Sequence, residues 1–237
     1  MSVPAHNGAQ TLLIDADDTL WENNVYFERA IANFISFLNH HEYTPVQVRE
    51  VLNDVERANV VKHGYGLLSF AHALVETFER LSVEPLTPAL HQTIRSFAHA
   101  IAENPVEVIS GVRETLAYLA GRHRLILMTK GNFTEQTGKV ERSGLKPHFA
   151  AIEVVPEKDP AMYREVVTKY GLAREITWMV GNSPKSDVNP ALAAGLNAVF
   201  VPHDQTWVLE HEELAQPGDG SGRLLVLERF AQLREHF

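Results

Sequence analysis

The sequence predicts an α/β protein in which a parallel β-sheet forms the core and a bundle of helices is inserted near the start of the chain. From residue 105 onward, short apolar runs alternate with amphipathic helical patterns, an order typical of parallel sheets with helices on both faces. Between residues 21 and 104 only the helical pattern occurs. We therefore expect residues 1–20 and 111–237 to form the α/β core, and residues 21–110 to form a separate helical domain.

The first part of the chain predicts one strand followed by four helices. The strand is expected at residues 11–15, where three apolar residues lead directly into acidic ones. In four successive segments after it, apolar residues recur at the spacing i, i+3, i+4 and i+7, which predicts amphipathic helices. Thr44-Pro45 and Thr87-Pro88 are typical helix starts, because a capping residue precedes a proline in the first helical turn. The aromatic residues on these faces are expected to pack in a core.

The second part predicts alternating helices and strands. The strands are expected at residues 125–128, 151–155, 176–180, 198–201 and 224–227, and the helices at residues 112–122, 133–143, 159–170, 187–194 and 228–235. Gly144 and Gly171 are expected to end two of these helices, and the Gly-rich segment 216–222 is expected to be a loop. Because ligands bind beyond the carboxyl ends of parallel strands, the residues that follow these strands are expected to meet at one edge of the sheet.

Composition limits the classes of protein to consider. The chain has 237 residues, 45% of them apolar, and a formal net charge of −9, which disfavours nucleic acid and anionic membranes as partners. It has no cysteine, which excludes thiol nucleophiles, thiolate metal sites and disulfides. Neither a signal pattern nor a long apolar run occurs. We expect a cytoplasmic protein, monomeric or homodimeric, that acts on a small molecule.

Two carboxylates follow the first strand. Asp15 and Asp17 are two residues apart, so they point the same way if the backbone stays extended. Like charges so close together repel each other, and a bound cation relieves the repulsion; carboxylate oxygens are ligands that suit Mg²⁺. A solvated acidic turn is the alternative interpretation of these residues taken alone.

Polar residues also follow the next two strands. Thr129 precedes Lys130, Gly131 and Asn132 at a predicted helix start, where a hydroxyl and backbone N–H groups can hold an oxyanion. Lys130 either adds positive charge near a substrate or points to solvent. Lys158 precedes another helix, where a compact cation can balance an acidic nucleophile or bind phosphate.

The segment 181–187 follows the fourth predicted core strand and carries further oxygen donors. Asp187 is a candidate Mg²⁺ ligand and also suits the N-cap of the following helix. Asn182 offers a neutral oxygen, which is a weaker Mg²⁺ ligand than a carboxylate.

These four segments resemble the motifs of the haloacid dehalogenase-like hydrolase superfamily. Asp15-Ala16-Asp17-Asp18-Thr19 is similar to its first motif, Asp-x-Asp-x-Thr, and Thr129 and Lys158 are similar to its second and third. Residues 181–187 resemble its fourth motif, Gly-Asp-Ser-x-x-x-Asp, except that Asn182 stands where relatives usually carry a metal-binding Asp. The superfamily commonly carries an α-helical cap between its first and second motifs, where the helical segment lies here.

The resemblance implies a Rossmann-like core and a Mg²⁺-dependent phosphatase that acts through an aspartyl-phosphate. Asp15 is then the nucleophile and Asp17 the general acid and base, while Thr129 and Lys158 stabilise charge on the transferring group. The implied metal ligands are Asp15, Asp17, Asn182 and Asp187. The candidate substrate contacts are Thr19, Trp21, Lys130, Gly131, Asn132 and Tyr65, the last between two helices of the expected cap.

Two other functions stay open. A dehalogenase of the same superfamily, acting on a 2-halo acid, would also use Asp15 but needs no metal, and Asp17 argues against it. A catalytically weak protein that only binds a phosphorylated ligand is the second alternative, and Asn182 is the feature that favours it.

Overall fold

The structure is a computed structural model that describes residues 8–38, 42–218 and 222–237. The chain divides into two compact units. The core unit consists of Met1–Glu22 and Val106–Phe237, and the helical unit consists of Asn23–Pro105. Each unit is described by itself. Residues 219–221 of the predicted Gly-rich loop lie outside the described residues.

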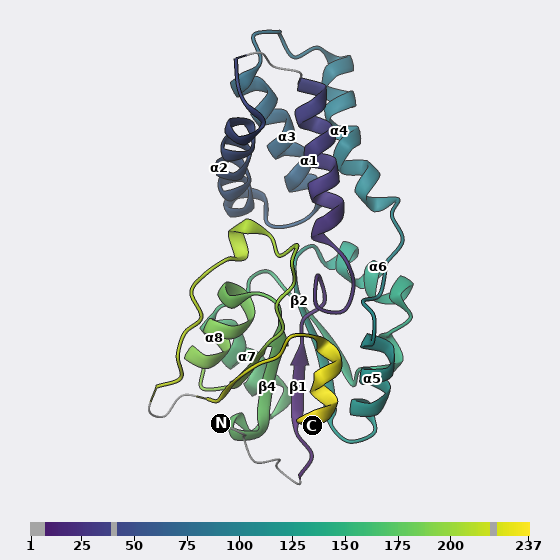
Figure 1. The fold of residues 1–237 in the computed structure, drawn as a ribbon, viewed down its shortest axis with the longest axis vertical. Coiled ribbons are helices and arrows are strands. Elements are labelled where there is room, and N and C mark those ends of the chain that lie inside the picture. Colours follow the sequence, from purple (N-terminus) through teal and green to yellow (C-terminus); the bar gives the residue numbers. More distant parts are fainter. Residues whose placement is uncertain (1–7, 39–41, 219–221) are drawn as a thin grey trace. The chain divides into compact units, whose positions relative to one another are not determined.

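The described part of the core unit is built on a parallel sheet with the strand order β3-β2-β1-β4-β5-β6 (Figure 1). The strands are β1 (Thr11–Ile14), β2 (Arg124–Lys130), β3 (Ala151–Val155), β4 (Thr177–Gly181), β5 (Asn197–Phe200) and β6 (Leu224–Val226). All of β1 is buried, as its apolar run predicts for a strand covered on both faces. The predicted α/β fold with a Rossmann-like sheet is confirmed.

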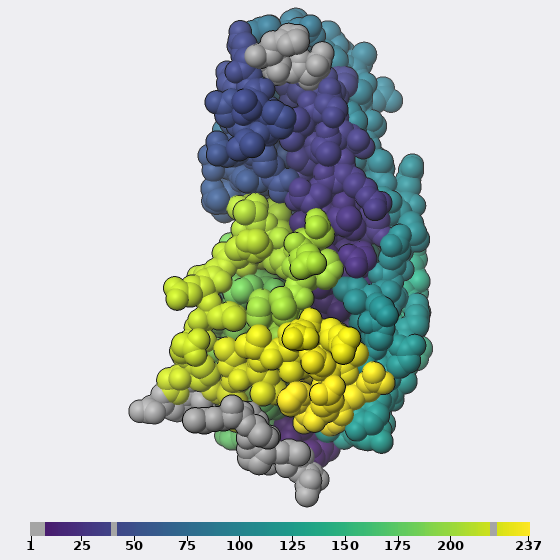
Figure 2. Space-filling model, viewed as in Figure 1, coloured from purple at the N-terminus to yellow at the C-terminus, as the bar shows by residue number. Residues whose placement is uncertain are grey.

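Helices cover both faces of this sheet because successive side chains of β1 point to opposite sides. On one face, Leu12 and Ile14 belong to the same buried cluster as residues of α5 (Val112–Ala120), α6 (Phe133–Ser143) and the 3₁₀ helix η5 (Phe230–Glu235). On the other face, Leu13 belongs to a cluster with α7 (Pro160–Tyr170) and α8 (Asn189–Ala193). In Figure 2 the C-terminal residues, in yellow, lie at the surface of the core unit next to α5, in teal.

Local sequence signals fix several element ends. Gly144 and Gly171 adopt left-handed backbone conformations and end α6 and α7, as predicted. In place of the single helix predicted at residues 187–194, the structure has a π-helical segment, η3 (Pro184–Val188), followed by the short helix α8. Pro190 lacks the N–H that an uninterrupted α-helix needs at this point. The last predicted helix, 228–235, is the 3₁₀ helix η5.

Among the described residues of the helical unit, the predicted four helices are α1 (Asn24–Leu38), α2 (Pro45–His63), α3 (Leu67–Leu81) and α4 (Pro88–Ala102). Thr44 caps α2 through a capping box with Gln47, and Thr87 caps α4. Buried apolar residues of all four helices form one core, to which aromatic side chains contribute as expected. None of the helices that the structure describes is long and apolar enough to cross a membrane.

Candidate active site

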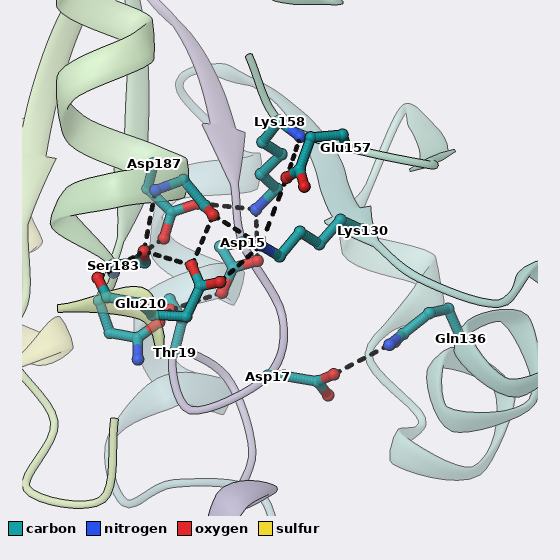
Figure 3. A network of polar contacts seen from close by, with 12 residues as sticks. Asp15, Asp17, Thr19, Lys130, Gln136, Glu157, Lys158, Ser183, Asp187 and Glu210 are labelled. Atoms are coloured by element: carbon teal, nitrogen blue, oxygen red, sulfur yellow. Dashed lines mark hydrogen bonds and ion pairs between the residues drawn. The ribbon is translucent and has the colours of Figure 1, made fainter. Parts of the chain in front are cut away.

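Three buried charged side chains meet at the carboxyl ends of the strands of the core unit. Asp15 follows β1, Lys158 follows β3 and Asp187 lies in η3 after β4. The ammonium nitrogen of Lys158 lies 2.5 Å from Asp15 Oδ1 and 2.7 Å from Asp187 Oδ1 (Figure 3). All three residues are at most 7% exposed. The fold therefore brings Lys158 into contact with Asp15, which lies 143 positions before it in the sequence, and with Asp187, which lies 29 positions after it.

The two carboxylates are only partly balanced by this one lysine. Burial lowers the pKa of Lys158, but the charges of Asp15 and Asp187 outweigh burial, so that this pKa is raised. Burial, with the nearby charge of Asp15, raises the pKa of Asp187 to about 7 in spite of the ion pair with Lys158. A second negative charge is thus unfavourable here unless another cation is present.

Asn182 and Thr19 complete a set of oxygen donors beside Asp15. The hydroxyl of Thr19 lies 3.0 Å from Asp15 Oδ2 and 3.2 Å from Asn182 Oδ1. The amide nitrogen of Asn182 donates to Thr206 Oγ1 at 2.9 Å, which directs its amide oxygen to the Thr19 side. Asp15, Asn182 and Asp187 are hard oxygen donors in a buried site with excess negative charge, and this donor set fits Mg²⁺.

The turn after β4 holds Asp187 in place through two close contacts. Asp187 Oδ2 accepts a hydrogen bond from the backbone N–H of Ser183 at 3.0 Å. A Cβ atom on Gly181 would lie 2.1 Å from the same oxygen, so only glycine fits at this position. The Ser183 hydroxyl also accepts from the N–H of Ser186 at 2.9 Å, which caps the start of η3.

Lys130 is paired with an acid that the sequence analysis did not select. Its ammonium nitrogen lies 2.6 Å from Glu210 Oε1 and 2.7 Å from the Ser186 hydroxyl. Glu210, in the 3₁₀ helix η4 (Val208–Glu210), also accepts from the hydroxyl of Ser183 at 2.6 Å. Burial raises the pKa of Glu210, but the charge of Lys130 and these hydrogen bonds outweigh burial and lower it. Lys130 is therefore turned into the core unit and not out to solvent.

Asp17 lies apart from the Asp15, Lys158 and Asp187 group. Figure 3 shows it directed toward Gln136, whose amide nitrogen donates to Asp17 Oδ2 at 2.9 Å. The expectation that Asp15 and Asp17 point the same way is wrong, because Asp15 contacts Lys158 whereas Asp17 is held by side chains of α6. Asp18 has a φ of 60°, and the N–H groups of Thr19 and Leu20 bond back to Ala16.

The environment of Asp17 is cationic. Burial raises the pKa of Asp17, but the charge of Lys139 and hydrogen bonds from Lys139, Gln136 and Trp21 outweigh burial and lower it. Gln136 and Lys139 are three residues apart on α6 and so lie on one helix face. This spacing in the sequence could have indicated that Gln136 and Lys139 act together. No comparable spacing indicates a role for Glu210.

The remaining predicted site residues lie in several environments. Thr129 is buried near the end of β2, in register with Val154 of β3. The N–H of Gly131 donates to the Val155 carbonyl at 3.0 Å, and the Asn132 side chain caps α6.

Trp21 and Tyr65, the two predicted aromatic contacts, lie in different units. Trp21 is buried in the core unit, with its indole N–H 2.7 Å from Asp17 Oδ1. Tyr65 lies in the helical unit between α2 and α3, and its role stays a prediction.

Comparisons with known proteins identify relatives of this chain. The family model for haloacid dehalogenase-like hydrolases matches residues 9–195. The solved structure of a haloacid dehalogenase-like family hydrolase from Xanthomonas campestris is 32% identical, with 95% of this chain and 92% of that chain covered and a TM-score of 0.79.

Two curated relatives match over shorter stretches. A phosphoserine phosphatase from Thermus thermophilus is 34% identical over 97 residues, which are 37% of this chain and 39% of that protein. The pyrimidine 5′-nucleotidase PynA from Streptococcus pneumoniae is 29% identical over 119 residues, 47% of this chain and 48% of that protein. The matched parts thus span less than half the length of these curated relatives. Because the family model matches most of the sequence and a solved relative aligns over nearly all of it, the chain belongs to the haloacid dehalogenase-like hydrolase family.

Proposed function

We propose that the protein is a Mg²⁺-dependent phosphatase that hydrolyses a phosphate monoester of a small molecule through a phosphorylated Asp15. The meeting of Asp15, Lys158 and Asp187 at the carboxyl edge of the sheet is the observation that carries this proposal. The curated relatives support it, since one is named a phosphoserine phosphatase and the other a pyrimidine 5′-nucleotidase.

Asp15 is the proposed nucleophile. One of its carboxylate oxygens forms a bond to phosphorus while the bond from phosphorus to the leaving-group oxygen breaks. Water then attacks the phosphorus of the aspartyl-phosphate, and Asp15 and inorganic phosphate are released. Lys158, already in contact with Asp15 Oδ1, is suited to stabilise negative charge on the transferring group.

Asp15, Asn182 and Asp187 are the proposed Mg²⁺ ligands. When bound, the ion would supply positive charge that offsets the carboxylates and the phosphate. The carboxylate of Asp17, the fourth predicted ligand, is held by α6 in this structure and is not among these donors.

Asp17 is the proposed general acid and base. As the bond from phosphorus breaks, it gives a proton to the leaving-group oxygen, and it later takes a proton from the attacking water. Both roles require its carboxylate to turn from α6 toward Asp15. The proposal also includes Thr129 as the residue that stabilises the oxyanion, and the helical unit Asn23–Pro105 as the cap. The candidate substrate contacts stay part of the proposal; they are Thr19, Trp21, Lys130, Gly131, Asn132 and Tyr65.

A screen of phosphate monoesters with and without Mg²⁺ tests this function, with Asp15→Asn as the blank. We expect phosphate release that requires Mg²⁺ and falls by about 10³-fold or more in Asp15→Asn, because a nucleophile is removed. Release of halide from a 2-halo acid without metal would favour the dehalogenase alternative. Tight binding of phosphorylated compounds without turnover would favour the binding protein.

A further inference from the structure

Three side chains outside the motifs of the family hold the carboxylate of Asp17. Lys139 Nζ lies 2.8 Å from Asp17 Oδ1 and 2.9 Å from Oδ2, so it bridges both oxygens. Gln136 Nε2 donates to Oδ2 at 2.9 Å, and Trp21 Nε1 donates to Oδ1 at 2.7 Å. We call Trp21, Gln136 and Lys139 the Asp17 clamp.

All three clamp side chains contact Asp17 through hydrogen-bond donors, so both oxygens of the Asp17 carboxylate act as acceptors. The lysine and aspartate side chains are 21% and 22% exposed, which leaves their ion pair mostly shielded from water. While the clamp holds it, the Asp17 carboxylate is directed toward Gln136 of α6 and lies apart from Asp15 (Figure 3).

The orientation of Gln136 is dictated by Asp17. Its amide oxygen is buried and has no hydrogen-bond partner among the residues that the structure describes, while its amide nitrogen faces the carboxylate. An unpaired buried oxygen is unfavourable, so the contact with Asp17 offsets this cost. The same amide nitrogen would lie 3.2 Å from a Cβ added to Gly131, so Gln136 lies beside the turn after β2. The clamp thus spans the turns that follow β1 and β2, and its members are positioned to control where Asp17 points.

We propose that Lys139, together with Gln136, is a positioning residue that holds Asp17 away from Asp15 in the resting protein, so that proton transfer begins only after the clamp releases it. This inference rests on the proposed function. Once released, Asp17 takes a proton from solvent and gives it to the leaving-group oxygen, as that oxygen separates from phosphorus and Asp15 bonds to phosphorus.

The first test follows the clamp directly and needs no activity. The indole N–H of Trp21 reports the contact with Asp17, and its resonance is measured in metal-free protein labelled with ¹⁵N. In Lys139→Met we expect this resonance to move toward its position in Asp17→Ala, whereas Lys139→Arg keeps the wild-type position. The indole of Trp178, which donates to Gln10, serves as the internal control and stays in place.

The second test separates positioning from general damage. Glycerol 2-phosphate has a leaving group that needs a proton, whereas p-nitrophenyl phosphate has one that departs as an anion. With Mg²⁺ present, we expect Lys139→Met to raise kcat/KM about threefold or more for the first compound and to change it less than about twofold for the second. Lys139→Arg restores wild-type values for both compounds. Lys146→Met is the matched control, because Lys146 is exposed and pairs with the exposed Glu141, and it leaves both values unchanged.

The outcomes distinguish this inference from the proposed function. An unchanged Trp21 resonance in Lys139→Met, or an equal fall in kcat/KM for both compounds, would overturn the positioning role. If the wild-type protein hydrolyses neither compound, the result counts against the proposed function, while the Trp21 resonance still decides whether Lys139 holds Asp17. Gln136→Leu provides a second variant, for which the same shift of the Trp21 resonance is expected.

Discussion

At the scale of single residues, the charge balance of the site depends on Lys158. Its buried ammonium group lies between the carboxylates of Asp15 and Asp187 and contacts both. Without it, two buried carboxylates would face each other with no cation between them, and like charges in a poorly solvated site are strongly unfavourable.

Lys158→Met is therefore expected to damage both stability and activity. In metal-free protein, we predict a loss of about 3–5 kcal/mol in the free energy of unfolding, as found when one partner of a buried ion pair is removed. Urea denaturation measures this loss. Lys185→Met is the control, because Lys185 is exposed and donates to the backbone carbonyl of Leu209. Equal stability of Lys158→Met and wild-type protein would show that the ion pairs are unimportant.

Asn182→Asp tests the proposed metal ligands. The change adds an anionic oxygen on the Thr19 side of the site, so we predict that a lower Mg²⁺ concentration gives half-maximal phosphate release. Asn189→Asp serves as the control. Asn189 is the first residue of α8, and its amide nitrogen donates to Glu212 in an exposed hydrogen bond. An unchanged or higher Mg²⁺ requirement in Asn182→Asp would place residue 182 outside the metal shell.

At the scale of elements, the turn between β4 and η3 has little room for change. Gly181→Ala places a Cβ against Asp187 Oδ2, and we expect Asp187 to be displaced, with phosphate release strongly reduced and a loss of about 1–3 kcal/mol in stability. Gly121→Ala, where the nearest neighbour would lie at 3.8 Å, is the matched control for urea denaturation and phosphate release. Full activity of Gly181→Ala would contradict the positioning of Asp187 by this turn.

Helix η4 is joined to the site by Glu210, and this link is expected to depend on pH. The pKa of Glu210 is lowered in the folded protein, so its ionised form favours folding. The stability that wild type has over Glu210→Gln is thus fully present above about pH 4.3, the usual pKa of glutamate. It is lost as the pH falls through the lower folded pKa. Urea denaturation of both proteins across this range measures the difference, and a difference that grows toward acid pH would contradict the assignment.

At the scale of the whole molecule, elements with local signals were predictable and side-chain directions were not. The buried run of β1, the proline and threonine at the start of α2 and the glycine after α6 each carry their own signal. The direction of Asp17 depends on contacts with Gln136 and Lys139, which lie 119 and 122 positions away in the sequence. The pairing of Lys130 with Glu210 joins residues 80 positions apart and leaves no local pattern.

The effect of Mg²⁺ on the thermal stability of the protein tests whether the ion binds at the proposed site. A ligand that binds only the folded state stabilises it, by about 2.7 kcal/mol when its concentration is one hundred times Kd. We therefore predict that Mg²⁺ raises the Tm of the wild-type protein relative to a sample with a chelator, and that Asp187→Asn loses most of this increase. The same increase in both proteins would show that Mg²⁺ binds away from Asp187.

The most direct test of the proposed chemistry is to find phosphate on Asp15 during turnover. Wild-type protein is mixed with Mg²⁺ and a hydrolysed phosphate monoester, quenched in acid, digested and examined by mass spectrometry. We predict one phosphoryl group on the peptide that contains Asp15, and none in Asp15→Asn treated in the same way. Steady phosphate release with no phosphorylated peptide, or release by Asp15→Asn at the wild-type rate, would contradict this prediction.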